Sequence, residues 1–128
     1  MRKAQTSAIP RDWIKSYKEV LNVPNWDFVE RYELNGVQYC HGEGGTASTK
    51  CRADMQNTIQ GHLHTQAYTQ HFCGRNFRIY GSQIGCGIDF DKYSFSYAKA
   101  GRKPAIGCMV VLDQGQLPIN LLMKLGGK

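Results

Sequence analysis

The sequence predicts a single domain of the mixed α/β (α+β) class. Short runs rich in β-branched and aromatic residues recur along the chain, and turn residues separate them. Two further segments have the spacing or the flanking residues of helices. A chain of 128 residues can bury one modest core but not two, so residues 1–128 are interpreted as one domain.

The N-terminal part is expected to form a helix followed by a hairpin. Pro10 suits the first position of a helix over residues 10–21, which the segment around Pro24 ends. Residues 26–34 and 37–40 are β-prone, and the Asn35-Gly36 dipeptide between them favours a tight turn. The second of these strands leads directly to His41. The apolar face of the helix is made of Trp13, Ile14, Tyr17, Val20 and Leu21.

The middle of the chain is expected to hold a loop, a short helix and a strand. Three of the four residues 42–45 are glycine, which excludes a regular element there. Residues 46–55 predict a short helix, and residues 57–60 predict a strand that runs into Gly61-His62-Leu63-His64. A second histidine motif therefore follows a strand end.

The C-terminal half is predicted to be mostly β-structure. Residues 81–89 are interrupted by glycines and are interpreted as a crossing, and residues 93–100 are ambiguous. The turn at residues 113–115 makes the last two strands a terminal hairpin. The predicted strands are residues 66–72, 76–80, 106–112 and 117–122.

Composition favours a soluble, reduced protein. The five cysteines form no Cys-x-x-Cys pair, which indicates free thiols in the cytoplasm. No apolar stretch approaches the ~20 residues of a membrane span, and no secretory signal follows the first residues. The net charge of +6 is spread along the chain, so it indicates at most a weak preference for phosphate-bearing partners, nucleic acid included.

Three of the four histidines lie in the two motifs at predicted strand ends. Imidazole is the commonest nitrogen ligand of divalent transition metals, and a His-x-His motif in a Gly-introduced loop can direct both rings to one pocket. The glycine before His62 is expected to provide the tight turn. By itself the motif is weak evidence, because surface and core histidines give the same pattern.

The order of these motifs resembles the closing half of the calcineurin-like metallophosphoesterase superfamily, in its bacteriophage and bacterial members. Those enzymes carry five signature blocks, and the chain matches the last two: the lone histidine followed by glycine at His41-Gly42, and the Gly-His-x-His at residues 61–64. The resemblance implies the C-terminal portion of a mixed β-sandwich flanked by helices. It also implies hydrolysis of phosphomonoesters or phosphodiesters by water activated at two metal ions.

Carried onto this sequence, the resemblance makes His41 and His62 ligands of one divalent ion and His64 a ligand of the other. Manganese is the expected metal, with iron, zinc and nickel as alternatives. The Asp-x-His, Gly-Asp and Gly-Asn-His blocks do not occur before His41. A complementing N-terminal half is therefore expected to supply them, and the chain alone is expected to be inactive and to need that half or an oligomer to cover an apolar face.

Two carboxylates and two alternative functions complete these expectations. Glu43 and Asp54 are possible partners that orient a metal-bound imidazole, although exposed surface charge is the commoner role. The first alternative function is a catalytically inactive half-domain that acts as a binding module. The second is an unrelated metal site built from His62, His64, His71 and Cys73.

Overall fold

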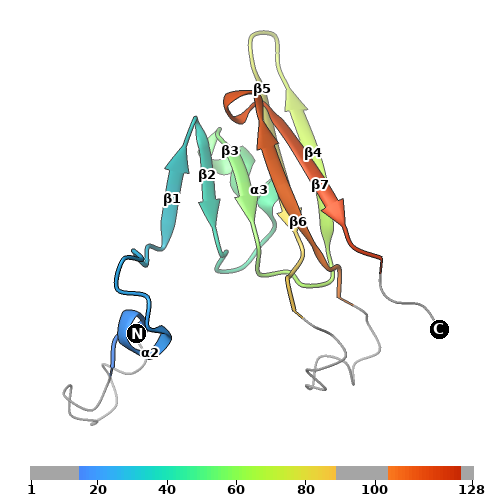
Figure 1. Cartoon of the computed structure of the whole chain (residues 1–128). Coiled ribbons are helices and arrows are strands. Elements are labelled where there is room, and N and C mark those ends of the chain that lie inside the picture. The colour runs from blue at the N-terminus through green and yellow to red at the C-terminus, as the bar shows by residue number, and fades with distance from the viewer. Residues whose placement is uncertain (1–14, 89–103, 125–128) are drawn as a thin grey trace.

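The computed structural model describes residues 15–88 and 104–124, which form an α+β arrangement and confirm the predicted class at that level (Figure 1). One sheet has five strands and a second sheet has two. In chain order the elements are α2 (Tyr17–Leu21), β1 (Arg31–Leu34), β2 (Val37–Cys40), α3 (Ala47–Asp54), β3 (Asn57–Gln60), β4 (Ala67–Cys73), β5 (Arg78–Ile84), β6 (Gly107–Leu112), the 3-10 turn η2 (Asp113–Gly115) and β7 (Leu117–Leu122).

The strand order of the larger sheet determines where the strand ends meet. That order is β1-β2-β3-β5-β4, and the central strands β2, β3 and β5 are parallel. The outer strands β1 and β4 pair antiparallel with their neighbours. The carboxyl ends of three parallel strands therefore lie at one edge of the sheet, which is the position where α/β sheets bind ligands.

Helix α3 covers one face of the larger sheet. Thr46 begins it by accepting a hydrogen bond from the Thr49 amide at 3.2 Å, and Met55 ends it in the left-handed region. The predicted helix over residues 46–55 is thus confirmed, with Thr46 and Met55 as its capping residues. Gly81 of β5 lets the helix approach closely, because a Cβ there would lie 2.6 Å from the carbonyl oxygen of Ala47.

The apolar core lies on the opposite face, beneath the hairpin β6–β7. Val37, Ile59 and Tyr80 are buried there, and Met109 and Val111 of β6 pack against them. The Tyr80 hydroxyl donates to the carbonyl oxygen of Gly115 at 2.8 Å, which anchors the hairpin turn. The chain therefore has three layers: helix, sheet and hairpin.

Several boundaries differ from the sequence-based predictions. The strand predicted over residues 26–34 begins only at Arg31, because its partner β2 has four residues and Arg31 pairs with the last of them. Strand β5 continues through Gly81 to Ile84, where a crossing was predicted, because the missing side chain admits α3 instead of breaking the strand. Of the first predicted helix, the structure describes only Tyr17–Leu21, capped by Ser16; residues 10–14 and 93–100 lie outside the described part.

In the described ranges, no helix has the length and apolar character needed to span a membrane.

Candidate metal centre

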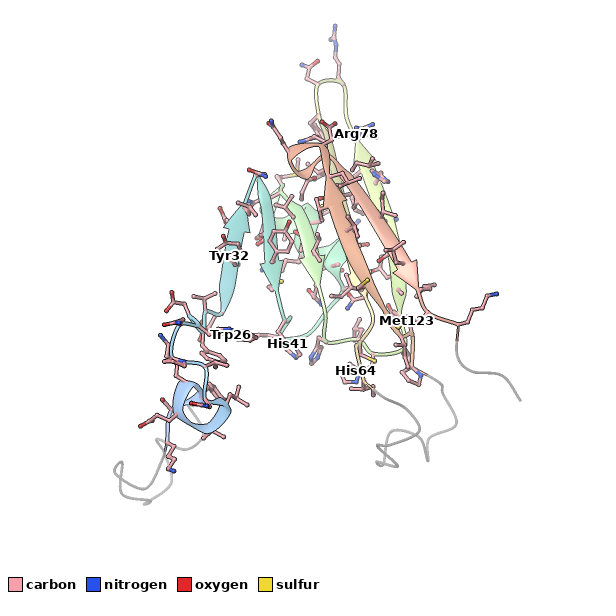
Figure 2. All side chains as sticks on the ribbon, in the orientation of Figure 1. Trp26, Tyr32, His41, His64, Arg78 and Met123 are labelled. Carbon is pink, nitrogen blue, oxygen red and sulfur yellow. The ribbon has the colours of Figure 1, made fainter. Side chains whose placement is uncertain are left out.

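Both histidine motifs lie at the carboxyl edge of the parallel strands. His41 follows the last residue of β2, and Gly61-His62 follows the last residue of β3, as predicted from the sequence. Because β2 and β3 are adjacent and parallel, their ends lie side by side. His41 and His64 are seen at the same end of the molecule in Figure 2.

The structure brings the imidazoles of His41 and His62 into direct contact. Nδ1 of His62 lies 3.3 Å from Nε2 of His41, and the ring centroids are 5.2 Å apart at an interplanar angle of 81°. Two nitrogens that each lie ~2.0–2.1 Å from one tetrahedral ion are about 3.3 Å apart. The spacing of these two nitrogens therefore fits a shared divalent ion, and both side chains are exposed enough to receive it.

The backbone at His62 has an uncommon conformation for a residue with a side chain. Its φ is +64°, and the Leu63 amide donates to the carbonyl oxygen of Gly61 at 2.7 Å. The bond closes a three-residue turn around His62 whose positive φ costs on the order of 1–3 kcal/mol. The tight turn expected at Gly61 thus begins at that residue, whose carbonyl oxygen closes it, while the positive φ lies at His62 itself.

Two buried glutamines hold the loops that carry these histidines. The fully buried Gln83 donates its side-chain amide to the carbonyl oxygen of Gly61, and its Oε1 accepts from the Ala47 amide at 3.3 Å. Gln60 donates to the carbonyl oxygen of Gly45 at 3.2 Å. One glutamine thus ties the His62 turn to helix α3, and the other ties strand β3 to the glycine loop.

Sequence reasoning missed both glutamines. Gln60 and Gln83 face each other in register on adjacent parallel strands, and each lies within two residues of its strand's end. For Gln60, a long polar side chain at the end of a predicted strand and close to a glycine-rich loop was the available signal, whereas Gln83 lay in the predicted crossing and had no such signal. Gln60 packs so closely under the loop that a Cβ at Gly42 would lie 2.7 Å from its side chain.

His64 lies at the same edge, where contacts to its backbone help to position it. Its carbonyl oxygen accepts from the Ala105 amide at 2.7 Å, and the Cys86 thiol lies 4.0 Å from the same oxygen. Across the two described ranges, no three His, Cys, Asp or Glu side chains form a group that could hold an ion. The imidazoles of His41 and His62 are therefore a contacting pair and not part of such a three-residue group within the described ranges.

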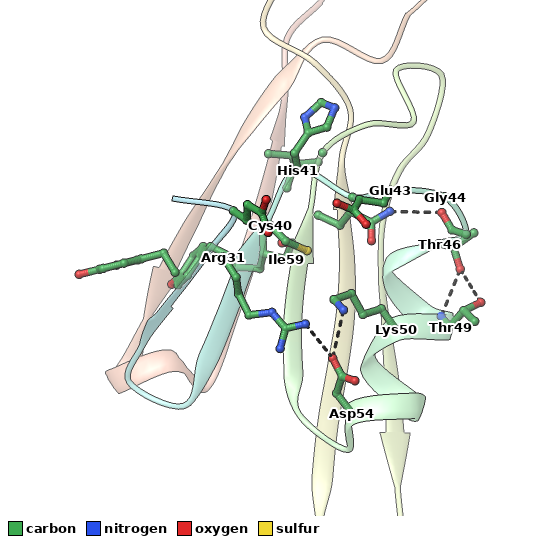
Figure 3. A pocket seen from close by; sticks show the side chains of 18 of the residues that line it. Arg31, Cys40, His41, Glu43, Gly44, Thr46, Thr49, Lys50, Asp54 and Ile59 are labelled. Atoms are coloured by element: carbon green, nitrogen blue, oxygen red, sulfur yellow. Dashed lines mark hydrogen bonds and ion pairs between the residues drawn. The ribbon is translucent and has the colours of Figure 1, made fainter. Parts of the chain in front are cut away.

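The two carboxylates singled out from the sequence lie apart from each other. Glu43 is an exposed residue of the glycine loop. Asp54 lies at the far end of α3, where its carboxylate accepts from Gln38 at 2.9 Å and pairs with Lys50 at 3.2 Å and Arg31 at 3.9 Å (Figure 3). The hydrogen bond from Gln38, followed by that from Lys50, lowers the pKa of Asp54 below its ordinary value.

The structure shows the surroundings of two further residues, Cys40 and His71. Burial raises the pKa of the Cys40 thiol, which lies 3.8 Å from the carbonyl oxygen of Ile59, so this thiol stays protonated beside the histidine pair. His71 on β4 packs against Tyr80 with 5.9 Å between ring centroids. His71 therefore offers a histidine away from the pair, suitable as a control.

No profile of a known protein family matches the chain, and no curated protein or solved structure shows significant similarity to it. The fold and the site define an α+β protein with a histidine pair at the carboxyl edge of parallel strands.

Proposed function

We propose that this chain contributes part of a two-metal centre that hydrolyses phosphoesters. His41 and His62 hold one divalent ion, and His64 reaches the second. The observation that carries the proposal is the 3.3 Å separation of the two imidazole nitrogens at adjacent strand ends. A bound ion pair would supply Lewis-acid polarisation of the phosphoryl group and a hydroxide near neutral pH.

The strained turn at His62 supports this role. A positive φ at a histidine lowers stability, and such conformations concentrate where a side chain must be aimed. The bonds from Leu63 and Gln83 to the carbonyl oxygen of Gly61 fix that turn from two sides. The backbone that carries the imidazole of His62 is therefore held in place before any ion binds.

The remaining ligands come from a partner in this proposal. An ion held by two imidazoles needs further oxygen or nitrogen ligands, and across the described ranges no third ligand joins the pair. The partner carries the carboxylate-containing Asp-x-His, Gly-Asp and Gly-Asn-His blocks, on a complementing half or on a further copy in an oligomer. Manganese suits such a mixed nitrogen and oxygen site, as do iron, zinc and nickel.

One observation favours a second function. Because the described side chains form no three-ligand group, the chain also fits a catalytically inactive module that binds one ion weakly and serves in assembly. The two functions differ in whether a completed site turns over a phosphoester.

The test is a titration of the purified chain with Mn²⁺, in which binding is measured by calorimetry and by electron paramagnetic resonance. We expect His41→Ala and His62→Ala each to weaken binding at least tenfold, and the matched variant His71→Ala to leave it unchanged. If all three substitutions changed the Mn²⁺ affinity equally, His41 and His62 would not be the metal ligands. Hydrolysis of p-nitrophenyl phosphate and of its bis ester by the chain mixed with its complement, abolished by His64→Ala, would separate the enzyme from the inactive module.

A further inference from the structure

The hairpin β6–β7 covers only part of the larger sheet. Strand β6 contacts β5 and strand β7 contacts β4, while β1 and β2 extend beyond the hairpin (Figure 1). On the uncovered side, Tyr32 and Leu34 of β1 are 54% and 49% exposed. An exposed apolar sheet face of this kind is typical of an interaction surface.

The uncovered face continues into the groove beside the histidine pair. Tyr32 pairs with Tyr39, and Tyr39 pairs with Ile59, so the three side chains share one face. Together with Ile84 they line one side of a groove of about 1030 Å³ that also reaches His41 and Gly61, and α3 and the glycine loop line its other side. Tyr39 and Ile59 therefore connect the uncovered face with the groove that reaches His41.

The edge of β6 on the side away from β7 has free backbone groups. The Gly107 amide points away from β7, because it donates to the carbonyl oxygen of Cys86 at 3.2 Å. Residues of an antiparallel strand alternate in the side to which their N–H and C=O groups point. Met109 and Val111 lie two and four residues after Gly107, so their N–H and C=O groups also point away from β7. In the described ranges no strand pairs with these two residues on that side.

The other sheet edges are less suited to strand addition. Pro118 of β7 lies opposite Val111 and has no amide hydrogen to offer at the outer edge of the hairpin. Strand β1 carries the charged Arg31 and Glu33, a common protection of an edge. The face of β4 is already contacted by β7, so a strand added there would bury little apolar surface.

We propose that the free edge of β6 receives an extended segment of the partner that completes the metal centre. The segment pairs with Met109 and Val111, and apolar side chains at every second position cover Tyr32, Leu34 and Tyr39. The first residues of β6 adjoin the histidine edge, because the Ala105 amide donates to the carbonyl oxygen of His64. A carboxylate at that end of the segment therefore reaches His41. This inference rests on the proposed function.

The test uses hydrogen exchange of the ¹⁵N-labelled chain with a synthetic peptide, acetyl-(Thr-Val)₃-Asp-amide, as the probe. We expect millimolar peptide to slow exchange of the Met109 and Val111 amides at least tenfold. Unchanged exchange at both amides, or slowing confined to β1 or β4, would overturn the proposal. Protection of the same amides without peptide that rises with protein concentration would also overturn it, because the occupant would then be a second copy of the chain.

Two variants separate strand addition from a general loss of structure. Tyr32→Lys with Leu34→Lys changes only exposed positions, and we expect it to keep the fold and weaken peptide protection several-fold. Pro118→Val leaves β6 untouched, so the protection of Met109 and Val111 should persist. Loss of protection in Pro118→Val, or full protection in the double lysine variant, would contradict the assigned edge.

A Zn²⁺ titration with and without peptide separates this inference from the proposed function. Tighter Zn²⁺ binding in the presence of peptide agrees with both. Peptide docking on β6 without any Zn²⁺ binding at the histidine pair would defeat the proposed function and leave the docking edge standing. Zn²⁺ binding at the pair without peptide protection on β6 would defeat the docking edge alone.

Discussion

Gln83 holds the turn that carries His62. Its side-chain amide donates to the carbonyl oxygen of Gly61, while its oxygen accepts from the Ala47 amide at the start of α3. Since Gln83 is fully buried, both contacts are made away from water, and each is costly to leave unmade. The position of His62 is thus coupled to the packing of helix α3 on the other side of the loop.

Replacement of Gln83 should affect metal binding as well as stability. Gln83→Leu leaves the Gly61 carbonyl and the Ala47 amide without this partner, and we expect a loss of about 1–3 kcal/mol in the free energy of unfolding. Gln83→Glu keeps the acceptor for Ala47 but loses the donor to Gly61. Metal affinity measured below the unfolding transition should fall in both variants, and an unchanged affinity in Gln83→Glu would show that the His62 turn holds without this bond.

Glycine at position 41 and glycine at position 62 should have unequal effects on stability. His62 has a φ of +64°, whereas His41 is not among the residues with positive φ. Relief of the backbone strain, on the order of 1 kcal/mol, should offset the entropy cost of glycine in His62→Gly. His41→Gly has no such compensation, so its urea midpoint should be the lower of the two, although both variants lose the metal.

The contact between α3 and the sheet depends on the small size of Gly81. A Cβ at this position would lie 2.6 Å from the Ala47 carbonyl oxygen and 2.7 Å from the Ser48 Cα. Gly81→Ala should therefore cost about 1–3 kcal/mol, as measured by urea denaturation. Gly87→Ala is the matched control, because nothing lies within 4 Å of a Cβ built there. Equal stability of the two variants would mean that the helix shifts freely on the sheet.

The stabilising contribution of the Asp54 carboxylate should be lost in acid. Its pKa is lowered in the folded state, chiefly by the hydrogen bond from Gln38, so the folded protein binds this proton less readily than the unfolded chain. The stabilisation is then present above the ordinary value of 3.8 and is lost as the pH falls through the lower, folded-state pKa. Urea midpoints at pH 7 and pH 3 should differ less in Asp54→Asn than in the unmodified chain.

A control for this pH effect is available in a surface pair. Asp27 bonds Lys18 at 3.1 Å, but its side chain is 88% exposed, and such pairs contribute little to stability. Asp27→Asn should therefore leave the difference between the two midpoints unchanged. If Asp27→Asn reduced the difference between the urea midpoints at pH 7 and pH 3 as much as Asp54→Asn does, net charge would be the cause of the loss of stability in acid. The hydrogen bond from Gln38 would then not be the cause.

Much of the secondary structure, and the position of both histidine motifs at strand ends, could be predicted from local signals. The Asn35-Gly36 turn, the Thr46 cap and the β-prone runs each indicate an element from a few neighbouring residues. The pairing of His41 with His62 required one more step, that β2 and β3 lie side by side and parallel. The motif order implied this only through the family resemblance.

Other features depend on contacts between distant parts of the chain and could not be predicted locally. Gly81 breaks a pattern in the sequence, yet in the structure it continues a strand because a helix packs on it. Asp54 is close to the histidine motifs in sequence, but Gln38, Lys50 and Arg31 hold it at the other end of the helix. Gln83 lies more than twenty residues from His62 and supports it only after the sheet has formed.

The most direct test of the account is a Zn²⁺ titration of the chain labelled with ¹⁵N in its histidines, observed by NMR of the imidazole nitrogens. Zn²⁺ is diamagnetic in this experiment, so each ring nitrogen can be followed. The account predicts that Nε2 of His41 and Nδ1 of His62 shift together with a single dissociation constant, while the nitrogens of His71 do not move. Independent shifts of His41 and His62, or no shift of either up to millimolar Zn²⁺, would contradict the claim that these two rings share an ion.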